Sequence, residues 1–180
     1  MSGSASGAAA CLCLIAGCAL FHGRGTPVGE ALRARQLMVP VAGVSPAQVP
    51  DTFRAPRGRG RGIHGAVDIP APRGTPVLSA DDGRVLRLNR NRKGGLTIYA
   101  TDPNQRFIYY YAHLQAYRQG ITKGARLVRG QVIGFVGTTG NADRREPHLH
   151  FQVMVRRGAR RLGGDPVDPR PFFVSAGRAR

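Results

Sequence analysis

The sequence has no tryptophan, and its cysteines are confined to the first eighteen residues, at Cys11, Cys13 and Cys18. The rest of the chain cannot form an internal disulfide, so a metal site there must use histidine and carboxylate ligands. Aromatic residues make up only 7% of the chain, which gives little support for the base-stacking surfaces of proteins that bind single-stranded nucleic acid. We therefore expect no nucleic-acid partner.

Acidic residues are also scarce. The 10 Asp and Glu face 27 Lys and Arg, which gives a formal net charge of +17. Such an excess attracts polyanions, among them nucleic acid, acidic lipid and the anionic bacterial envelope. All but two of the basic residues are arginines, a bias that the coding composition of a genome can produce, so the charge alone is a weak clue. Solvated surface is the simplest interpretation, and binding to anionic envelope polymers through the Arg-rich surface is the alternative.

Long hydrophobic runs are missing, and the longest covers residues 8–21. A run of this length is too short for a membrane-spanning helix of about 20 residues but fits the apolar region of a signal peptide. The sequence IAGC at residues 15–18 is similar to a bacterial lipobox, whose cysteine is lipidated. No Lys or Arg precedes the run, which weakens the export signal and leaves a buried N-terminal helix as the alternative. We predict a signal peptide over residues 1–18, export to the periplasm or cell envelope, and a candidate lipid anchor to the outer membrane at Cys18.

The remaining chain consists of two regions that differ in composition. Residues 19–60 are rich in Gly, Pro and Arg, and we interpret them as a flexible tether. From Ile63 onward, short runs of β-branched and aromatic residues alternate with Gly, Pro, Asn and Asp. This alternation predicts one mainly β domain over residues 61–175, an antiparallel sheet or sandwich-like fold, followed by a short tail at 176–180.

Histidines mark the polar faces of the predicted strands. Side chains at positions i and i+2 of a strand point to the same face. In HLHFQVMV (148–155) this rule places His148 and His150 on one face and Leu149, Phe151, Val153 and Val155 on an apolar one. In HGAVDI (64–69) it places His64 with Asp68, and in FIYYYAHL (107–114) it places His113 with Tyr111, Tyr109 and Phe107.

Zinc suits this set of side chains best. It binds imidazole and carboxylate ligands, and a catalytic site keeps three protein ligands and one open position for water. Histidines that do not bind the metal can accept a proton or stabilise a developing oxyanion. A single histidine in a strand is more often structural, but four histidines and a carboxylate in patterned positions make that reading less favourable.

Three motifs carry a family resemblance. His64-x-x-x-Asp68, YAHL at 111–114 and PHLHF at 147–151 resemble the signatures of the LytM/lysostaphin-type zinc metallopeptidases, which are peptidoglycan endopeptidases. The similarity extends from residue 62 to about residue 173. It implies that His64, Asp68 and His150 bind one zinc ion in a groove on the sheet, and that His113 and His148 are catalytic.

The resemblance also implies a function. We expect a zinc metalloendopeptidase that hydrolyses the peptide cross-links of bacterial peptidoglycan and takes peptidoglycan stem peptides as its partner. The alternative is a catalytically silent wall-binding or amidase-activating module of the same fold. Glu146 and Gln152 stand where many members of the family have Gly and Glu. These departures concern loop geometry and substrate preference more than the chemistry.

Overall fold

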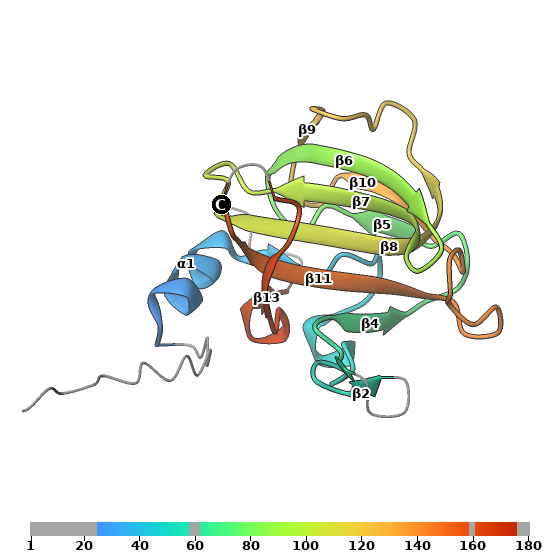
Figure 1. Ribbon diagram of the computed structural model, residues 1–180, viewed down its shortest axis with the longest axis horizontal. Coiled ribbons are helices and arrows are strands. Elements are labelled where there is room, and N and C mark those ends of the chain that lie inside the picture. The colour runs from blue at the N-terminus through green and yellow to red at the C-terminus, as the bar shows by residue number, and fades with distance from the viewer. Residues whose placement is uncertain (1–24, 58–61, 159–160, 176–180) are drawn as a thin grey trace, which may run out of the picture.

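The computed structural model describes residues 25–57, 62–158 and 161–175 (Figure 1). The predicted signal peptide, Cys18 and the tail at 176–180 lie outside the described residues. Among the helices within those ranges, none has the length and apolarity needed to cross a membrane.

An antiparallel sheet dominates the molecule (Figure 1). Its strands are β4 (Val67–Pro70), β5 (Pro76–Leu78), β6 (Gly83–Asn91), β7 (Gly95–Thr101), β8 (Phe107–Tyr117), β9 (Arg126–Leu127), β10 (Val132–Val136), β11 (His148–Arg156) and β12 (Gly164–Val167). The order across the sheet is β12-β11-β8-β7-β6-β9, while β4 pairs with β11, and β10 pairs with both β5 and β8. The predicted mainly β, antiparallel fold is confirmed.

The apolar face of β11 packs into the core as its alternation predicts. Leu149, Phe151 and Val153 are fully buried, and the Phe151 ring lies 5.1 Å from the ring of Tyr111 on β8. Burying one such side chain contributes about 1.5–3 kcal/mol. Because alternate residues of a strand point to opposite faces, this burial commits His148 and His150 to the other face of the sheet.

Residues 25–57 pack against this core. They include α1 (Pro27–Arg35), β1 (Leu37–Met38), a 3-10 turn (Pro46–Gln48) and β2 (Pro56–Arg57), which pairs with β3 (Gly62–Ile63). Thr26 caps α1 by accepting a hydrogen bond from the backbone N–H of Gly29. β1 runs parallel to β13 (Phe173–Val174), which follows a second 3-10 turn (Arg170–Phe172).

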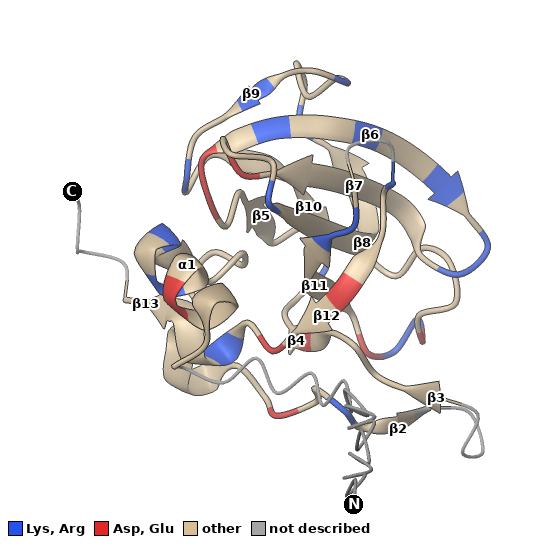
Figure 2. Cartoon of the chain, turned by 60° about the vertical axis from the view of Figure 1, so that its left-hand side comes forward, with Lys and Arg blue, Asp and Glu red and all other residues tan. Residues whose placement is uncertain are grey.

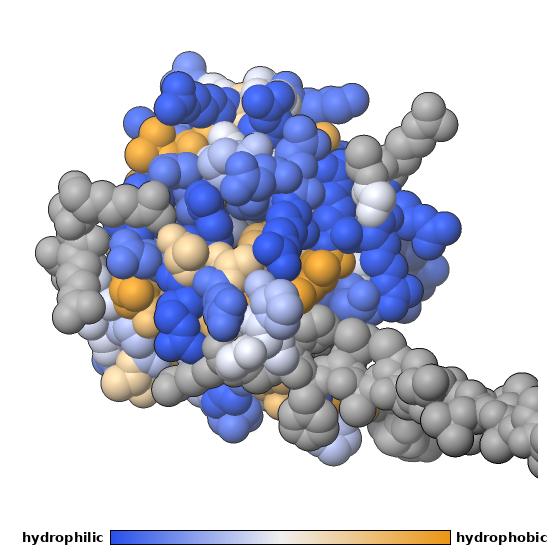
Figure 3. Space-filling model, turned by 90° about the vertical axis from the view of Figure 1, so that its left-hand side faces the viewer, coloured by the Kyte–Doolittle hydropathy of each residue, from blue (hydrophilic) through white to orange (hydrophobic). Residues whose placement is uncertain are grey.

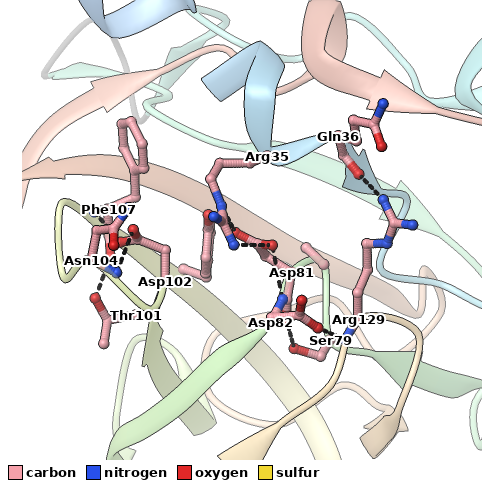
Figure 4. Close-up of polar contacts among 12 residues, drawn as sticks. Arg35, Gln36, Ser79, Asp81, Asp82, Thr101, Asp102, Asn104, Phe107 and Arg129 are labelled. Atoms are coloured by element: carbon pink, nitrogen blue, oxygen red, sulfur yellow. Dashed lines mark hydrogen bonds and ion pairs between the residues drawn. The ribbon is translucent and has the colours of Figure 1, made fainter. Parts of the chain in front are cut away.

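Both apolar and polar contacts dock this N-terminal segment. Leu32 and Leu37 are fully buried in the core. The Arg35 guanidinium donates two hydrogen bonds, of 2.6 and 2.8 Å, to the buried carboxylate of Asp81 (Figure 4). The hydroxyl of Tyr109 on β8 donates to the same carboxylate at 2.7 Å. Burial and the nearby Asp81 raise the pKa of Tyr109, so this hydroxyl remains a donor.

The prediction of a flexible tether over residues 19–60 is therefore wrong for residues 25–57. Their composition resembles a linker, but a few apolar side chains and one buried ion pair anchor them to the sheet. Arg129 adds a further contact, because its guanidinium donates to the carbonyl oxygen of Gln36 at 2.8 Å (Figure 4).

Candidate metal centre

Strand pairing brings Asp68 and His150 together. β4 and β11 are antiparallel, and His150 lies directly opposite Asp68 in their register. The Nδ1 atom of His150 is 2.8 Å from Oδ1 of Asp68. Directly paired side chains of an antiparallel pair share one face and have neighbouring Cβ atoms, which explains the short distance.

His64 joins the pair from the segment that precedes β4. Its backbone N–H donates to Ala55 O and its carbonyl accepts from Arg54 N, so the N-terminal segment holds its backbone. Its Nε2 atom lies 3.2 Å from Nδ1 of His150 and 3.3 Å from Oδ1 of Asp68. The structure thus brings together all three residues that the sequence predicted as zinc ligands.

The geometry of this cluster fits zinc. Tetrahedral bonds of about 2.0–2.2 Å separate neighbouring ligand atoms by about 3.3–3.6 Å. Two of the three separations, 3.2 and 3.3 Å, are close to that value, and the third, between His150 Nδ1 and Asp68 Oδ1, is shorter at 2.8 Å. Two imidazoles and one carboxylate are also the ligand types of catalytic zinc sites that keep one position open.

The carboxylate of Asp68 is ionised in this setting. Burial alone would raise the pKa of Asp68, but the hydrogen bonds and charges of His150 and His64 outweigh it and hold the pKa well below its usual value. A deprotonated carboxylate is the form that binds a metal.

His113 reaches the site through a β-bulge that the alternation rule did not predict. The register between β7 and β8 shifts by one residue between the pairs Ile98–Tyr111 and Leu96–Leu114. His113 has a φ of 61°, and its backbone N–H donates to Gly94 O at 2.7 Å. An extra residue of this kind reverses the alternation of side chains beyond it.

The predicted grouping of His113 with three aromatic residues is therefore wrong. Phe107, Tyr109 and Tyr111 point into the core, where each is at most 1% exposed. The His113 ring instead lies among the other histidines, with its centroid 5.0 Å from that of His148 and 5.7 Å from that of His150. Sequence alternation located the correct strand but not the bulge.

His113 and His148 present the same ring nitrogen to the site. Nδ1 of His113 donates to Thr139 O and Nδ1 of His148 donates to Glu146 O, both at 2.8 Å. Each bond requires Nδ1–H and leaves the lone pair of a neutral ring on Nε2. In His148 that Nε2 atom is 3.9 Å from Oδ1 of Asp68. Burial lowers the pKa of His113 to about 4, only partly offset by the hydrogen bond to Thr139, so its ring is neutral near pH 7.

Thr139 holds the carbonyl that orients His113. Its hydroxyl oxygen accepts from Leu96 N at 2.9 Å and donates to Leu114 O at 2.7 Å. The backbone of Gly95 packs against this side chain with a φ of 66°, and a Cβ atom there would overlap Oγ1 of Thr139. Glycine is therefore required at position 95 for the loop to reach His113.

A groove of about 830 Å³ opens beside the cluster. Its lining is mainly apolar and rich in proline, and it consists of Pro50, Thr52, Asp68, Pro70, Ala71, Pro72, Glu146, Pro147 and His148. The groove adjoins the cluster, because Asp68 and His148 form part of its lining.

A family model for "Peptidase family M23" matches residues 62–169. This chain belongs to that family. The match begins just before His64 and ends after β12, so it includes every predicted ligand and catalytic histidine. The resemblance to LytM/lysostaphin-type enzymes is confirmed.

Two curated M23 relatives show the range of named activities. The L-Ala–D-Glu endopeptidase of Bacillus subtilis is 38% identical over 112 residues, which cover 59% of this chain and 34% of the relative. The peptidoglycan DD-endopeptidase ShyC of Vibrio cholerae is 38% identical over 92 residues, which cover 51% of this chain and 20% of the relative. This chain therefore spans at most about a third of the length of either relative.

Solved structures agree on the M23 fold. A zinc-containing peptidase from Vibrio cholerae superposes with a TM-score of 0.62 at 29% identity, over 76% of this chain and 40% of that one. The catalytic domain of lysostaphin from Staphylococcus simulans gives a TM-score of 0.54 at 27% identity, over 79% of this chain and 95% of that one.

Two residues that contact the predicted ligands or catalytic histidines were not identified from the sequence motifs. Thr139 lies in the run Gly137-Thr138-Thr139-Gly140, which falls within the range of the family resemblance but offers no metal-binding or titratable side chain. Thr52 lies outside the matched range, and its carbonyl oxygen accepts a hydrogen bond from Nδ1 of His64. No sequence signal could have found Thr52, because only the packing of residues 25–57 brings it to the site.

Proposed function

We propose that this chain is a zinc metalloendopeptidase that hydrolyses peptide cross-links of bacterial peptidoglycan. The observation that carries the proposal is the convergence of His64 Nε2, Asp68 Oδ1 and His150 Nδ1 within 3.3 Å of one another. His113 and His148 lie beside them. A catalytically silent module of this fold would have no need to keep the whole set, so the complete site favours the enzyme.

The side chains of this protein can hold a metal ion and transfer protons. A zinc ion held by His64, Asp68 and His150 would add Lewis-acid chemistry, which lowers the pKa of water and polarises a carbonyl oxygen. An Nε2 atom of His113 or His148 that carries its lone pair can accept a proton from the attacking water. Once protonated, either ring can donate a hydrogen bond from Nε2 to the tetrahedral oxyanion or pass the proton to the leaving amine. The hydrogen bonds to Thr139 and Glu146 keep both Nε2 atoms available for these steps.

The metal assignment is tested by zinc analysis of the purified protein and of His64→Ala, Asp68→Ala and His150→Ala. We expect about one zinc per chain in the unaltered protein, because three ligands form one site. Each variant should lose most of the metal and its activity on purified cell walls. Full zinc occupancy in any one variant would remove that residue from the ligand set.

The substrate is tested with defined muropeptides. The two relatives above are named for different bonds, so the family match alone does not select one. We propose a D-alanyl–diaminopimelate bond for a Gram-negative host and a glycyl bond otherwise. Digesting both kinds of cross-linked muropeptide and identifying the new amine would decide between them. Cleavage of neither substrate would favour the silent-module alternative.

We propose that the protein is exported and anchored through lipid at Cys18. The support is the apolar run at residues 8–21 and the IAGC sequence at residues 15–18. A single acyl chain binds membranes only marginally, so a stable anchor needs more than one. Cell fractionation of the unaltered protein and Cys18→Ser, with the intact mass of the mature chain, tests this. Soluble unaltered protein without lipid mass would contradict the anchor.

We propose that a cationic face at the β6–β9 edge of the sheet holds the enzyme near anionic envelope polymers. Basic residues lie along β6, β9 and the turn between β6 and β7 (Figure 2), and the exposed ones are Arg84, Arg87, Arg90, Arg92, Lys93 and Arg126. None of the six forms an ion pair with any carboxylate that the structure describes. The side of the molecule that lies on the left in Figure 1 is also mostly hydrophilic, with only small, separate apolar areas (Figure 3).

Retention on a resin that carries an anionic polyphosphate measures how strongly this face binds such polymers. Arg84→Gln/Arg87→Gln/Arg90→Gln should weaken binding to a teichoic-acid-type polyphosphate, and the dependence on salt should become shallower because fewer counterions are exchanged. Arg157→Gln, which replaces an exposed arginine directly after β11, is the control. Equal salt dependence in both variants would contradict a role for the β6 face.

A further inference from the structure

Thr52 contacts two of the three proposed zinc ligands. Its backbone carbonyl accepts a hydrogen bond from Nδ1 of His64 at 2.7 Å. Its side-chain hydroxyl oxygen accepts one from the backbone N–H of Asp68 at 2.8 Å. Thr52 belongs to none of the three motifs and precedes the family match, which starts at residue 62.

The carbonyl contact selects the tautomer of His64. A hydrogen bond from Nδ1–H to a carbonyl oxygen leaves the lone pair on Nε2, which is the atom that faces Asp68 and His150. Metal-binding histidines generally need such a partner on the second ring nitrogen, because it fixes the ring orientation and raises the basicity of the ligand atom.

The hydroxyl contact fixes the backbone of Asp68. β4 pairs with β11, yet the N–H of Asp68 donates to Thr52 instead of to that neighbour. The hydroxyl therefore satisfies a backbone donor at the free side of a short strand. Because the Asp68 carboxylate lies only a few bonds from this N–H, a shift of the strand would move Oδ1 relative to both histidines.

Thr52 is itself held by the rest of the fold. The neighbouring Asp51 carboxylate pairs with the Arg170 guanidinium at 2.7 Å. On the other side, Ala55 N donates to Thr52 O at 3.1 Å, and Ala55 O accepts from His64 N at 3.0 Å. These contacts connect Thr52 to the C-terminal turn and to His64, so its two hydrogen bonds are pre-set by packing.

We propose that Thr52 is a positioning residue that orients His64 and Asp68 for metal binding, an inference that rests on the proposed function. The N-terminal segment would then complete the metal site from outside the part of the chain that the family model matches. An M23 domain cut at residue 62 would lack this support.

The test is the zinc dissociation constant of Thr52→Val, measured by competition with a chromophoric chelator. Valine has the shape of threonine but cannot accept the Asp68 N–H, and removing such a supporting contact typically weakens metal binding about 10–100-fold. We expect about a tenfold weaker constant for Thr52→Val. Thr52→Ser keeps the hydroxyl and should stay within about threefold of the unaltered protein.

A spectroscopic measurement separates positioning from general stability. The visible absorption of the cobalt-substituted protein reports ligand geometry, and it should change in Thr52→Val and be restored in Thr52→Ser. Thr122→Val, an exposed threonine in the loop before β9, is the matched control and should change neither quantity. Unaltered zinc affinity and cobalt spectrum in Thr52→Val would overturn the proposal.

Failure of this proposal can be distinguished from failure of the proposed function. If His64→Ala, Asp68→Ala and His150→Ala keep their zinc, the ligand set itself is wrong. If these variants lose zinc while Thr52→Val binds it like the unaltered protein, only the role of Thr52 is wrong.

Discussion

Two regions of the molecule differ in how the sequence encodes their structure: the strands of the metal site, and the N-terminal segment 25–57. In β4 and β11 the sequence indicates which side chains face the core, because apolar residues alternate with Asp68 in β4 and with His148 and His150 in β11. Residues 25–57 show no such alternation, yet they bury Leu32 and Leu37 as completely as β11 buries Phe151. A linker-like composition therefore does not exclude a fixed place in the fold.

The physical origin of this difference is the range of the stabilising contacts. A strand's pattern is local, since each residue points opposite to the one before it. The N-terminal segment instead depends on partners far along the chain, such as Asp81 for Arg35 and β13 for β1. Variants of the histidines should accordingly lose activity, whereas variants of the residues that anchor the segment, such as Arg35, should lose stability.

The largest effect is expected for His113→Ala and His148→Ala. Each should keep zinc and lose about 10²–10⁴ in turnover, the usual contribution of a positioned acid–base group. Zinc analysis together with single-turnover rates on a cross-linked muropeptide measures both quantities. Loss of zinc from His148→Ala would show instead that both histidines of the PHLHF motif bind the metal.

A smaller effect is expected for Arg35→Met in the N-terminal segment. It removes the cation from Asp81, whose side chain is 1% exposed. Breaking a buried ion pair costs about 3–5 kcal/mol, and we expect about 3 kcal/mol because Tyr109 still donates to the carboxylate. Urea unfolding of the metal-free protein measures the loss.

Arg157→Met is the matched control for this prediction. It breaks an ion pair with Asp165 in which the arginine side chain is 60% exposed, so it should cost less than about 1 kcal/mol. Equal losses in Arg35→Met and Arg157→Met would show that the N-terminal segment is not anchored through Asp81.

The smallest effect concerns the bulge at His113. With a φ of 61°, this position favours glycine over alanine, so His113→Gly should be more stable than His113→Ala by about 1 kcal/mol. His148 begins a strand and is not among the residues with positive φ. There His148→Gly should be less stable than His148→Ala by about 0.5–1 kcal/mol. The same sign at both positions in thermal unfolding would contradict the bulge.

The mainly β fold, the apolar face of β11 and the three motifs from which the ligand set was predicted can all be read from the amino-acid sequence. These features depend on local patterns or on residue types with specific chemistry, so they can be predicted before the fold is known. Tertiary structure alone decided that His113 leaves the aromatic face of β8, because the bulge arises from pairing with β7 and from the contact of His113 N with Gly94 O. It alone also decided that Thr52 meets His64 and Asp68, since that contact depends on the docking of a segment whose anchors lie elsewhere in the chain.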